Sequence, residues 1–248
     1  MAGIRVTIWN EHRHEQTDAK VQAVYPDGIH APIAKYLSDL GHEVHVSTLD
    51  DDDCGLTPEV LDNTDVLIWW GHTAHNLVMD DIVDRIQARV LAGMGFIALH
   101  SSHESKPFMR LMGTSCGLLW RDIGEKEKLW VTNPYHPISK GIDAVIELDH
   151  EEMYGECFDV PNPDDVVFTS WFEGGNVFRS GCTWHRGRGK IFYFRPGHEA
   201  YPTYYNKEIL HVIANAVEWA KFDGNTEAAG IGKAANMPFL LAPVEKNE

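Results

Sequence analysis

The chain has 248 residues, of which 44% are hydrophobic, 23% charged and 10% aromatic, as in a globular protein of one or at most two domains. This composition excludes a disordered chain, a collagen-like fibre and a disulfide scaffold. The 21 basic and 37 acidic residues give a net charge of −16 with neutral histidine, and no Lys/Arg-rich run is present. We therefore expect neither nucleic acid nor a membrane as a partner.

The cysteines and apolar stretches indicate the compartment. Four cysteines lie far apart with no paired metal-binding spacing, and no signal peptide precedes them. The longest apolar runs, such as 66–70 and 96–99, are much shorter than the roughly 20 residues that cross a bilayer. We expect a soluble cytoplasmic protein with reduced thiols.

The first half of the chain alternates short apolar runs with segments of helical periodicity, as βαβ units do. The continuously apolar runs VLIWW and FIAL indicate strands buried on both faces, in the middle of a parallel sheet. The predicted strands are 5–9, 43–49, 65–70 and 96–100, and the predicted helices are 31–40, one beginning at Thr57-Pro58, and 79–92.

The second half has a different pattern. Short strands are predicted at 129–132, 145–148 and 166–171, followed by a hairpin of 177–185 and 190–195 and a final amphipathic helix over 207–221. We interpret this half as α+β decoration of a mostly parallel central sheet, all in one α/β domain of residues 1–222. Residues 223–248 lack periodicity, and we expect an extended tail or one that packs on a neighbouring subunit of a homo-oligomer.

Histidines follow four of the predicted strands. Among the 14 histidines, His14 follows the first strand, His72 and His75 the third, His100 and His103 the fourth, and His198 the last. Ligands of open α/β sheets bind beyond the carboxyl ends of the strands, so these side chains predict a polar pocket there.

Histidine and carboxylate together suit either metal binding or acid–base catalysis, and the sequence leaves both open. As a metal site, the candidate ligands are His72, His103 and His198, with zinc ahead of iron or manganese. As acid–base groups, the candidates are Glu152, His198, Glu199 and His100.

Aromatic side chains accompany these polar groups, which suits a sugar whose CH faces pack on rings while its hydroxyls form hydrogen bonds. We expect Tyr154 to lie in an acid-rich loop, 151–156, that forms one wall of the pocket. The predicted substrate-binding residues are His14, His30, His75, Trp70, Tyr154 and Tyr201.

Two common enzyme classes lack their motifs. No Gly-x-Ser-x-Gly turn of a serine hydrolase occurs, and the first strand leads into NEHRHE instead of Gly-x-Gly-x-x-Gly. No nucleotide cofactor is expected. Gly187-Arg188-Gly189 is explained by a hairpin turn.

Several long strings in the sequence are unusual. They include EHRHE (11–15), WWGHTAH (69–75), LHSSHESKPFMRLMGT (99–114), EEMYGE (151–156) and FRPGHEAYPTYY (194–205). These strings resemble those of the trehalose-utilisation (ThuA-like) family, and the likeness spans residues 4 to about 222. This family shares the class I glutamine-amidotransferase-like fold, so the resemblance implies a three-layer, flavodoxin-like sandwich.

The resemblance implies a role in the catabolism of trehalose or related disaccharides, after a partner sugar 3-dehydrogenase has formed the 3-keto sugar. Amidotransferases place a cysteine nucleophile at the strand–helix elbow, where this chain has His100-Ser101-Ser102. Glutamine hydrolysis is therefore not expected, and Cys116 is interpreted as structural. The leading hypothesis is an enzyme that isomerises, eliminates or hydrolyses a 3-keto sugar by acid–base chemistry, with a metal as a possible aid. The alternative is a non-catalytic sugar-binding or regulatory protein on an old enzyme fold.

Overall fold

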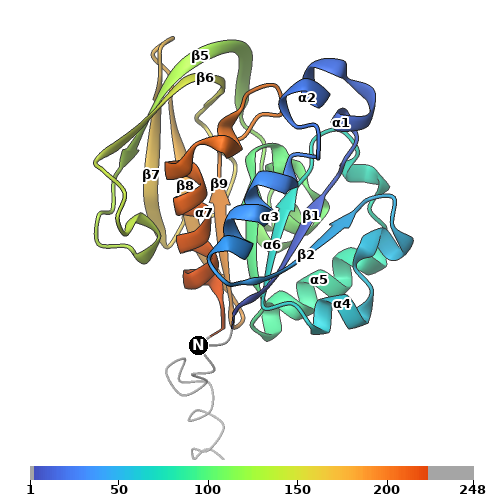
Figure 1. Ribbon diagram of the computed structural model, residues 1–248. Coiled ribbons are helices and arrows are strands. Elements are labelled where there is room, and N and C mark those ends of the chain that lie inside the picture. The colour runs from blue at the N-terminus through green and yellow to red at the C-terminus, as the bar shows by residue number, and fades with distance from the viewer. Residues whose placement is uncertain (1–2, 223–248) are drawn as a thin grey trace, which may run out of the picture.

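The computed structural model describes residues 3–222, which build one nine-stranded sheet in the order β2-β1-β3-β4-β9-β8-β7-β5-β6. Figure 1 shows this sheet with helices on both sides. The strands are β1 (Arg5–Asn10), β2 (Glu43–Thr48), β3 (Val66–Trp70), β4 (Gly95–Leu99), β5 (Leu119–Val131), β6 (Val145–Gly155), β7 (Asp165–Phe172), β8 (Val177–Arg186) and β9 (Gly189–Phe194). The α-helices are α1 (His14–Thr17), α2 (Ala19–Val24), α3 (His30–Asp39), α4 (Pro58–Asp62), α5 (Asp80–Ala92), α6 (Lys106–Met112) and α7 (Lys207–Ala220).

The first half of the chain forms the parallel part of the sheet, as predicted. Strands β2, β1, β3, β4 and β9 pair in parallel. Every residue of β3 and β4 is buried, because helices cover both faces of these central strands. The predicted bounds of the first four strands agree with the observed bounds to within one residue.

Two hydrophobic clusters separate the layers of the fold. One cluster joins the apolar residues of α3 and α7 to one face of the sheet, including Ile33 and Ile213. The other joins α4, α5 and α6 to the opposite face, including Leu61 and Ile86. The chain is therefore a three-layer α/β sandwich, which confirms the predicted fold class.

The second half extends the same sheet, whereas it was expected to decorate it. Strands β8, β7, β5 and β6 add to β9 in antiparallel pairs. The strands expected at 129–132 and 145–148 cover only parts of β5 and β6. The prediction of a loop at 151–156 is wrong, because Glu151–Gly155 continue β6. Irregular register between Arg121 and Glu127 and a run of acidic residues conceal the strand alternation here, since Glu and Asp have low strand propensity.

The parallel strands β1, β3, β4 and β9 end at one edge of the sheet, where α1 and α2 also lie (Figure 1). This common edge brings the histidine-bearing connections together. The tail predicted at 223–248 lies outside the described residues. Within residues 3–222, no helix is long and apolar enough to span a membrane.

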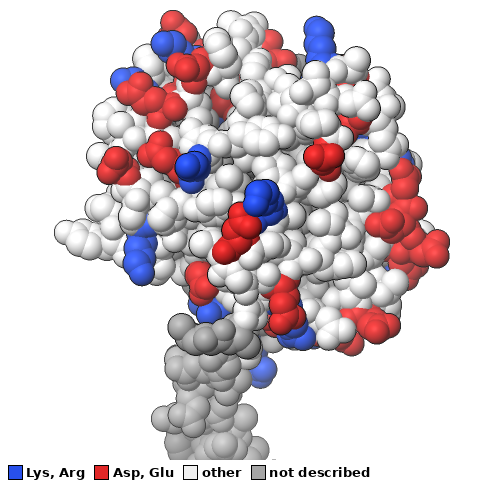
Figure 2. All heavy atoms as spheres, viewed as in Figure 1, with Lys and Arg blue, Asp and Glu red and all other residues white. Residues whose placement is uncertain are grey.

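The charged side chains lie mainly at the surface. The acidic run Asp50–Asp53 is exposed, as expected of a solvated loop. In Figure 2, acidic side chains gather at the right edge of the molecule, while the lysines and arginines on this face are scattered singly.

Candidate functional site

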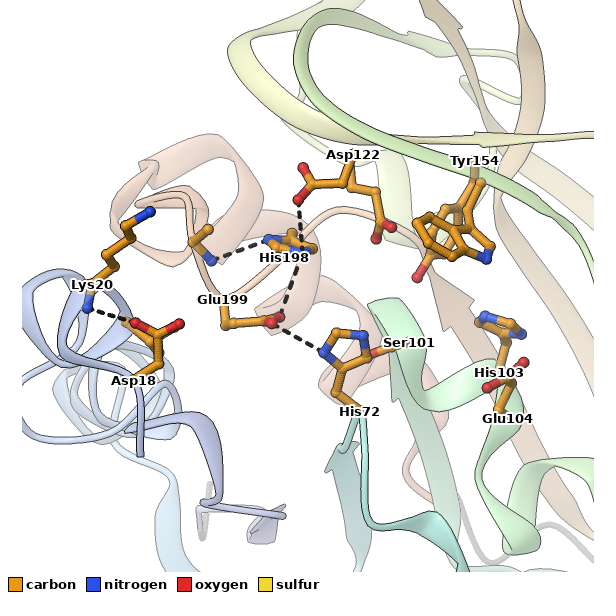
Figure 3. Close-up of a pocket in the computed structure, with 14 residues that line it drawn as sticks. Asp18, Lys20, His72, Ser101, His103, Glu104, Asp122, Tyr154, His198 and Glu199 are labelled. Atoms are coloured by element: carbon orange, nitrogen blue, oxygen red, sulfur yellow. Dashed lines mark hydrogen bonds and ion pairs between the residues drawn. The ribbon is translucent and has the colours of Figure 1, made fainter. Parts of the chain in front are cut away.

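A cavity of about 440 Å³ lies at the carboxyl edge of the parallel strands. Figure 3 shows its lining side chains, which come from α2 and its N-cap, from the connections after β3, β4 and β9, and from β5 and β6. Pockets that bind small molecules generally start at about 300 Å³, so this one can hold a sugar. It is lined by Asp18, Lys20, Val21, His72, Ser101, His103, Glu104, Trp120, Asp122, Glu152, Tyr154, His198, Glu199 and Ala200.

One cluster of titratable groups consists of His14, His72 and Glu199. Nδ1 of His14 lies 2.6 Å, and Nδ1 of His72 3.0 Å, from the same oxygen, Oε1 of Glu199. The Glu199 side chain is only 6% exposed. We call these three residues the outer cluster; their potential ligand atoms lie within 4.8 Å of one another.

The charge states within the outer cluster follow from these contacts. Burial alone would raise the pKa of Glu199, but the contacts with His14 and His72 outweigh it and hold this pKa well below its usual value. Contact with Glu199 raises the pKa of His14. Burial would lower the pKa of His72, but contact with Glu199 outweighs this effect, so the pKa of His72 is raised as well. Glu199 is therefore a carboxylate at neutral pH.

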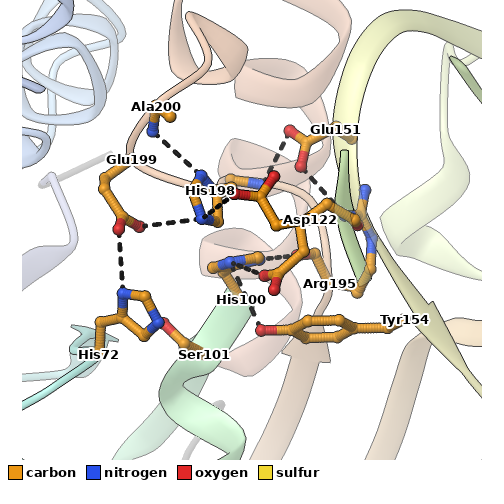
Figure 4. A network of polar contacts seen from close by, with 12 residues as sticks. His72, His100, Ser101, Asp122, Glu151, Tyr154, Arg195, His198, Glu199 and Ala200 are labelled. Atoms are coloured by element: carbon orange, nitrogen blue, oxygen red, sulfur yellow. Dashed lines mark hydrogen bonds and ion pairs between the residues drawn. The ribbon is translucent and has the colours of Figure 1, made fainter. Parts of the chain in front are cut away.

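A second group, the inner cluster, consists of His100, Glu152 and His198, which are all buried. Figure 4 shows two of its members, with His100 between His198 and Tyr154. Nε2 of His100 lies 3.1 Å from Oε2 of Glu152 and 3.4 Å from the hydroxyl of Tyr154. Burial would raise the pKa of Glu152, but His100, His198 and His72 together lower it. The Glu152 side chain therefore faces the cavity in its basic, carboxylate form.

Hydrogen bonds to the backbone distinguish the two ring nitrogens of the inner histidines. Nδ1 of His100 donates to the carbonyl oxygen of Arg195 at 2.9 Å, which directs Nε2 toward Glu152. Nδ1 of His198 instead accepts from the Ala200 N–H at 3.1 Å. Burial lowers the pKa of His198, so the ring is neutral at neutral pH and carries its proton on Nε2. Nε2 of His198 is therefore a hydrogen-bond donor.

The connection after β4 has an unusual backbone conformation. His100 has φ = 51°, in the left-handed region, and it is buried directly after Leu99. Such a conformation in a non-glycine residue costs of order 1–3 kcal/mol and is typical of functional sites. It turns the chain sharply so that the imidazole of His100 lies beneath the cavity.

Glu11 fixes the connection that carries His72. Its buried carboxylate accepts hydrogen bonds from the backbone N–H groups of His72, Thr73 and Ala74 at 2.8, 3.0 and 2.9 Å. The hydroxyl of Thr73 donates to it as well. In the sequence, Glu11 is visible only as one acid among neighbouring histidines.

Arg195 anchors the floor of the site. Its side chain is fully buried and donates to Oε2 of Glu151 and to the carbonyl oxygen of Glu152, at 3.0 and 2.8 Å, and also pairs with Glu127. Burial would lower the pKa of Arg195, but the two glutamates outweigh this effect and raise it. Two acids thus face one arginine, and burial raises the pKa of Glu127.

The family comparison agrees with the resemblance seen in the sequence. A family model described as ThuA, trehalose utilisation, matches residues 5–220. The chain belongs to this family. No curated protein matches the chain at a significant level.

Solved structures of low sequence identity share the fold of this ThuA chain. It is similar to a ThuA-like protein from Parabacteroides merdae, with 14% identity, a TM-score of 0.67 and coverage of 88% of this chain and 90% of the other. A ThuA-like protein from Bacteroides uniformis gives 16% identity, a TM-score of 0.63 and coverage of 87% and 90%. A GMP synthase protein from Thermoplasma acidophilum gives 13% identity, a TM-score of 0.52 and coverage of 88% and 96%. The last likeness supports the amidotransferase-like fold.

The structure of the ThuA chain brings most of the predicted site residues together. The cavity is lined by His72, His103, Glu152, Tyr154, His198 and Glu199. His14 and His100 contact this lining through Glu199 and Glu152. Tyr201 contacts two lining residues: its hydroxyl donates a hydrogen bond to Asp122 at 2.8 Å, and its ring centroid lies 5.3 Å from that of His198.

Of the six predicted substrate-binding residues, only Tyr154 lines this cavity. His14 and Tyr201 contact its lining, whereas Trp70, His30 and His75 have other surroundings. Trp70 is buried in the core, where its indole N–H donates to the Gly197 carbonyl, so it supports the loop that carries His198. His30 lies at the start of α3, with Nδ1 2.9 Å from the Asn10 amide nitrogen. His75 lies in a neighbouring depression that is also bordered by His72. Trp70 and His75 were expected at the pocket because they end or follow a strand, but the direction of a side chain at a strand end is not readable from spacing.

The predicted metal-ligand set is divided between clusters. His72 belongs to the outer cluster and His198 to the inner one, while His103 belongs to neither. Nδ1 of His103 donates to the Cys116 carbonyl at 2.8 Å, and burial lowers its pKa to about 4. Burial also raises the pKa of Cys116 to about 11, consistent with a structural thiol.

Two residues of β5, Trp120 and Asp122, line the cavity, and neither was among the predicted site residues, although Trp120 is one of the aromatic residues that accompany the polar clusters in the sequence. Trp120 is 68% exposed and pairs in register with Tyr154 of β6, so its indole is available to a ligand. Nε2 of His198 lies 3.9 Å from Oδ2 of Asp122. Neither residue could be placed, because the start of β5 was not predicted as a strand.

Proposed function

We propose that this chain is an enzyme of disaccharide catabolism that acts on a 3-keto sugar by acid–base chemistry, with Glu152 as the base and His198 as the hydrogen-bond donor to the ketone oxygen. The observation that carries the proposal is the opposition of a buried carboxylate and a donor imidazole in one cavity. Their facing atoms lie within 4.8 Å of each other, and Oε2 of Glu152 has no hydrogen-bond partner among the described residues.

A ketone makes the hydrogens on the adjacent carbons acidic. An unmodified disaccharide has no ketone and therefore no such acidic C–H bond. Glu152 takes a proton from the carbon between the ketone and the glycosidic carbon, and the C–H electron pair becomes the new carbon–carbon double bond. The carbonyl electron pair moves to oxygen, where His198 Nε2–H donates a hydrogen bond to the oxyanion. In elimination, this pair re-forms the carbonyl, the double bond shifts to the glycosidic carbon, and the bond to the glycosidic oxygen breaks as that oxygen takes the proton held by Glu152. In isomerisation, the former carbonyl carbon takes that proton instead, and the hydroxyl proton on the neighbouring carbon passes to the oxyanion, so that the neighbouring carbon becomes the ketone.

The surroundings of the two residues support this chemistry. His100 lies against Glu152 and can exchange a proton with it through Nε2, while the pKa of the buried Tyr154 hydroxyl is raised, so the phenol stays neutral. Trp120 offers an exposed ring on which a sugar face can pack. The substrate requires a dehydrogenase that oxidises a sugar hydroxyl to a ketone.

Incubating the protein with trehalose and, separately, with 3-keto-trehalose tests the proposed substrate class. We expect only the keto form to be consumed, because only its ketone acidifies a neighbouring C–H bond. Proton NMR of each sugar over time reports consumption, and calorimetry reports affinity. Equal affinity for both sugars with consumption of neither would instead identify a sugar-binding protein.

A further inference from the structure

We infer that the outer cluster, His14, His72 and Glu199, is a binding site for one divalent transition-metal ion, with an open coordination position toward the cavity. Two imidazoles and one carboxylate form the ligand set of many catalytic zinc and non-haem iron centres. This site differs from the set predicted from sequence, which shares only His72 with it. The inference does not depend on the proposed keto-sugar chemistry.

Unpartnered buried atoms point to an ion. Nδ1 of His14 lies 2.6 Å from Glu199 but is not aligned for a hydrogen bond, and it has no hydrogen-bond partner among the described residues. Oε2 of Glu199, on a residue only 4% exposed, has none either. Buried polar groups normally have partners, and a cation between the two imidazoles and the carboxylate would satisfy both atoms.

Buried carboxylates hold the segments that carry two of the three ligands, His72 and His14. The carboxylate of Glu11 holds the backbone of His72 and its two successors, as described above. Glu15, next to His14, is buried and accepts from the Asn10 amide at 2.7 Å and from the Ile29 N–H at 2.9 Å. Such outer contacts orient metal ligands before the ion arrives.

The inner cluster is the less suitable of the two for a metal. Its His198 accepts a backbone hydrogen bond at Nδ1, so a proton occupies Nε2 and no lone pair is available there. His72 and Glu199 also line the cavity, so an ion in the outer cluster would have its open position beside the inner acid–base pair. A metal there would polarise a substrate oxygen.

The test is zinc binding to untagged protein, measured by elemental analysis after equilibration with ZnCl₂ and dialysis. We expect about one equivalent per chain in the wild type and less than about a tenth in His14→Ala, His72→Ala and Glu199→Gln, since each loses one of three ligands. Cobalt(II) gives a second readout, a visible absorption band that these variants lose. Circular dichroism verifies that each variant is folded.

Two matched variants locate the site. His103→Ala removes a cavity histidine outside both clusters, and His198→Ala removes the imidazole of the inner cluster; both should keep the zinc. The inference is overturned if the folded wild type binds no zinc, or if either of these variants loses the ion as completely as His14→Ala does. Because no substrate is used, these outcomes are independent of the proposed reaction.

Discussion

Replacing Glu152 by glutamine is expected to lower kcat for a 3-keto disaccharide by about 10²–10⁴-fold, the usual contribution of a general base. The amide keeps the shape of the side chain but cannot accept the substrate proton. KM should change much less, because the walls of the cavity stay in place. Steady-state kinetics with the keto sugar measures both constants.

Glu147→Gln provides the matched control for this prediction. Glu147 lies on the same strand, β6, but it is exposed and pairs at the surface with Lys128 at 3.1 Å. We expect its kcat to equal that of the wild type. An equal loss in both variants, or no loss in Glu152→Gln, would remove Glu152 from the role of base.

Replacing Arg195 by methionine is expected to lower the free energy of unfolding by about 3–5 kcal/mol, because it removes one partner from a buried ionic network. Glu127 and Glu151, both fully buried, would lose the positive charge that they share. Urea denaturation at neutral pH, followed by circular dichroism, measures the change.

Arg110→Met is the comparison for Arg195→Met. Arg110 pairs with Asp84 at the surface, where an ion pair contributes only about 0–1 kcal/mol. Adding Glu127→Gln and Glu151→Gln to Arg195→Met should recover part of the lost stability, since no buried charge is then left unpaired. If Arg195→Met cost no more than Arg110→Met, the network would not anchor the site.

The parallel half of the fold could be predicted because its signals are local. The apolar runs of β3 and β4 are buried on both faces, and Gly93 ends α5 with a positive φ that glycine tolerates. The antiparallel half could be predicted only in part. Strand β5 of this half has six charged residues among thirteen and an irregular register. Neither its composition nor an alternation of apolar and polar residues therefore reveals the full length of the strand.

The position of the candidate site could be predicted, but its internal division could not. Histidines at the ends of parallel strands converge because those ends share one edge of the sheet. Whether His72 meets His14 or His198 depends on side-chain directions and on buried anchors such as Glu11 and Arg195. Those anchors act through contacts between residues far apart in sequence, for example the 61 positions that separate Glu11 from His72.

The most direct test of the central claim, proton abstraction by Glu152 beside a ketone, is hydrogen exchange of a 3-keto disaccharide in D₂O. The wild type should catalyse deuterium incorporation at the carbon between the ketone and the glycosidic carbon, seen as loss of its proton NMR signal. Glu152→Gln should slow this incorporation by about the same 10²–10⁴-fold as kcat. Incorporation no faster than without protein, or equally fast with Glu152→Gln, would contradict the account.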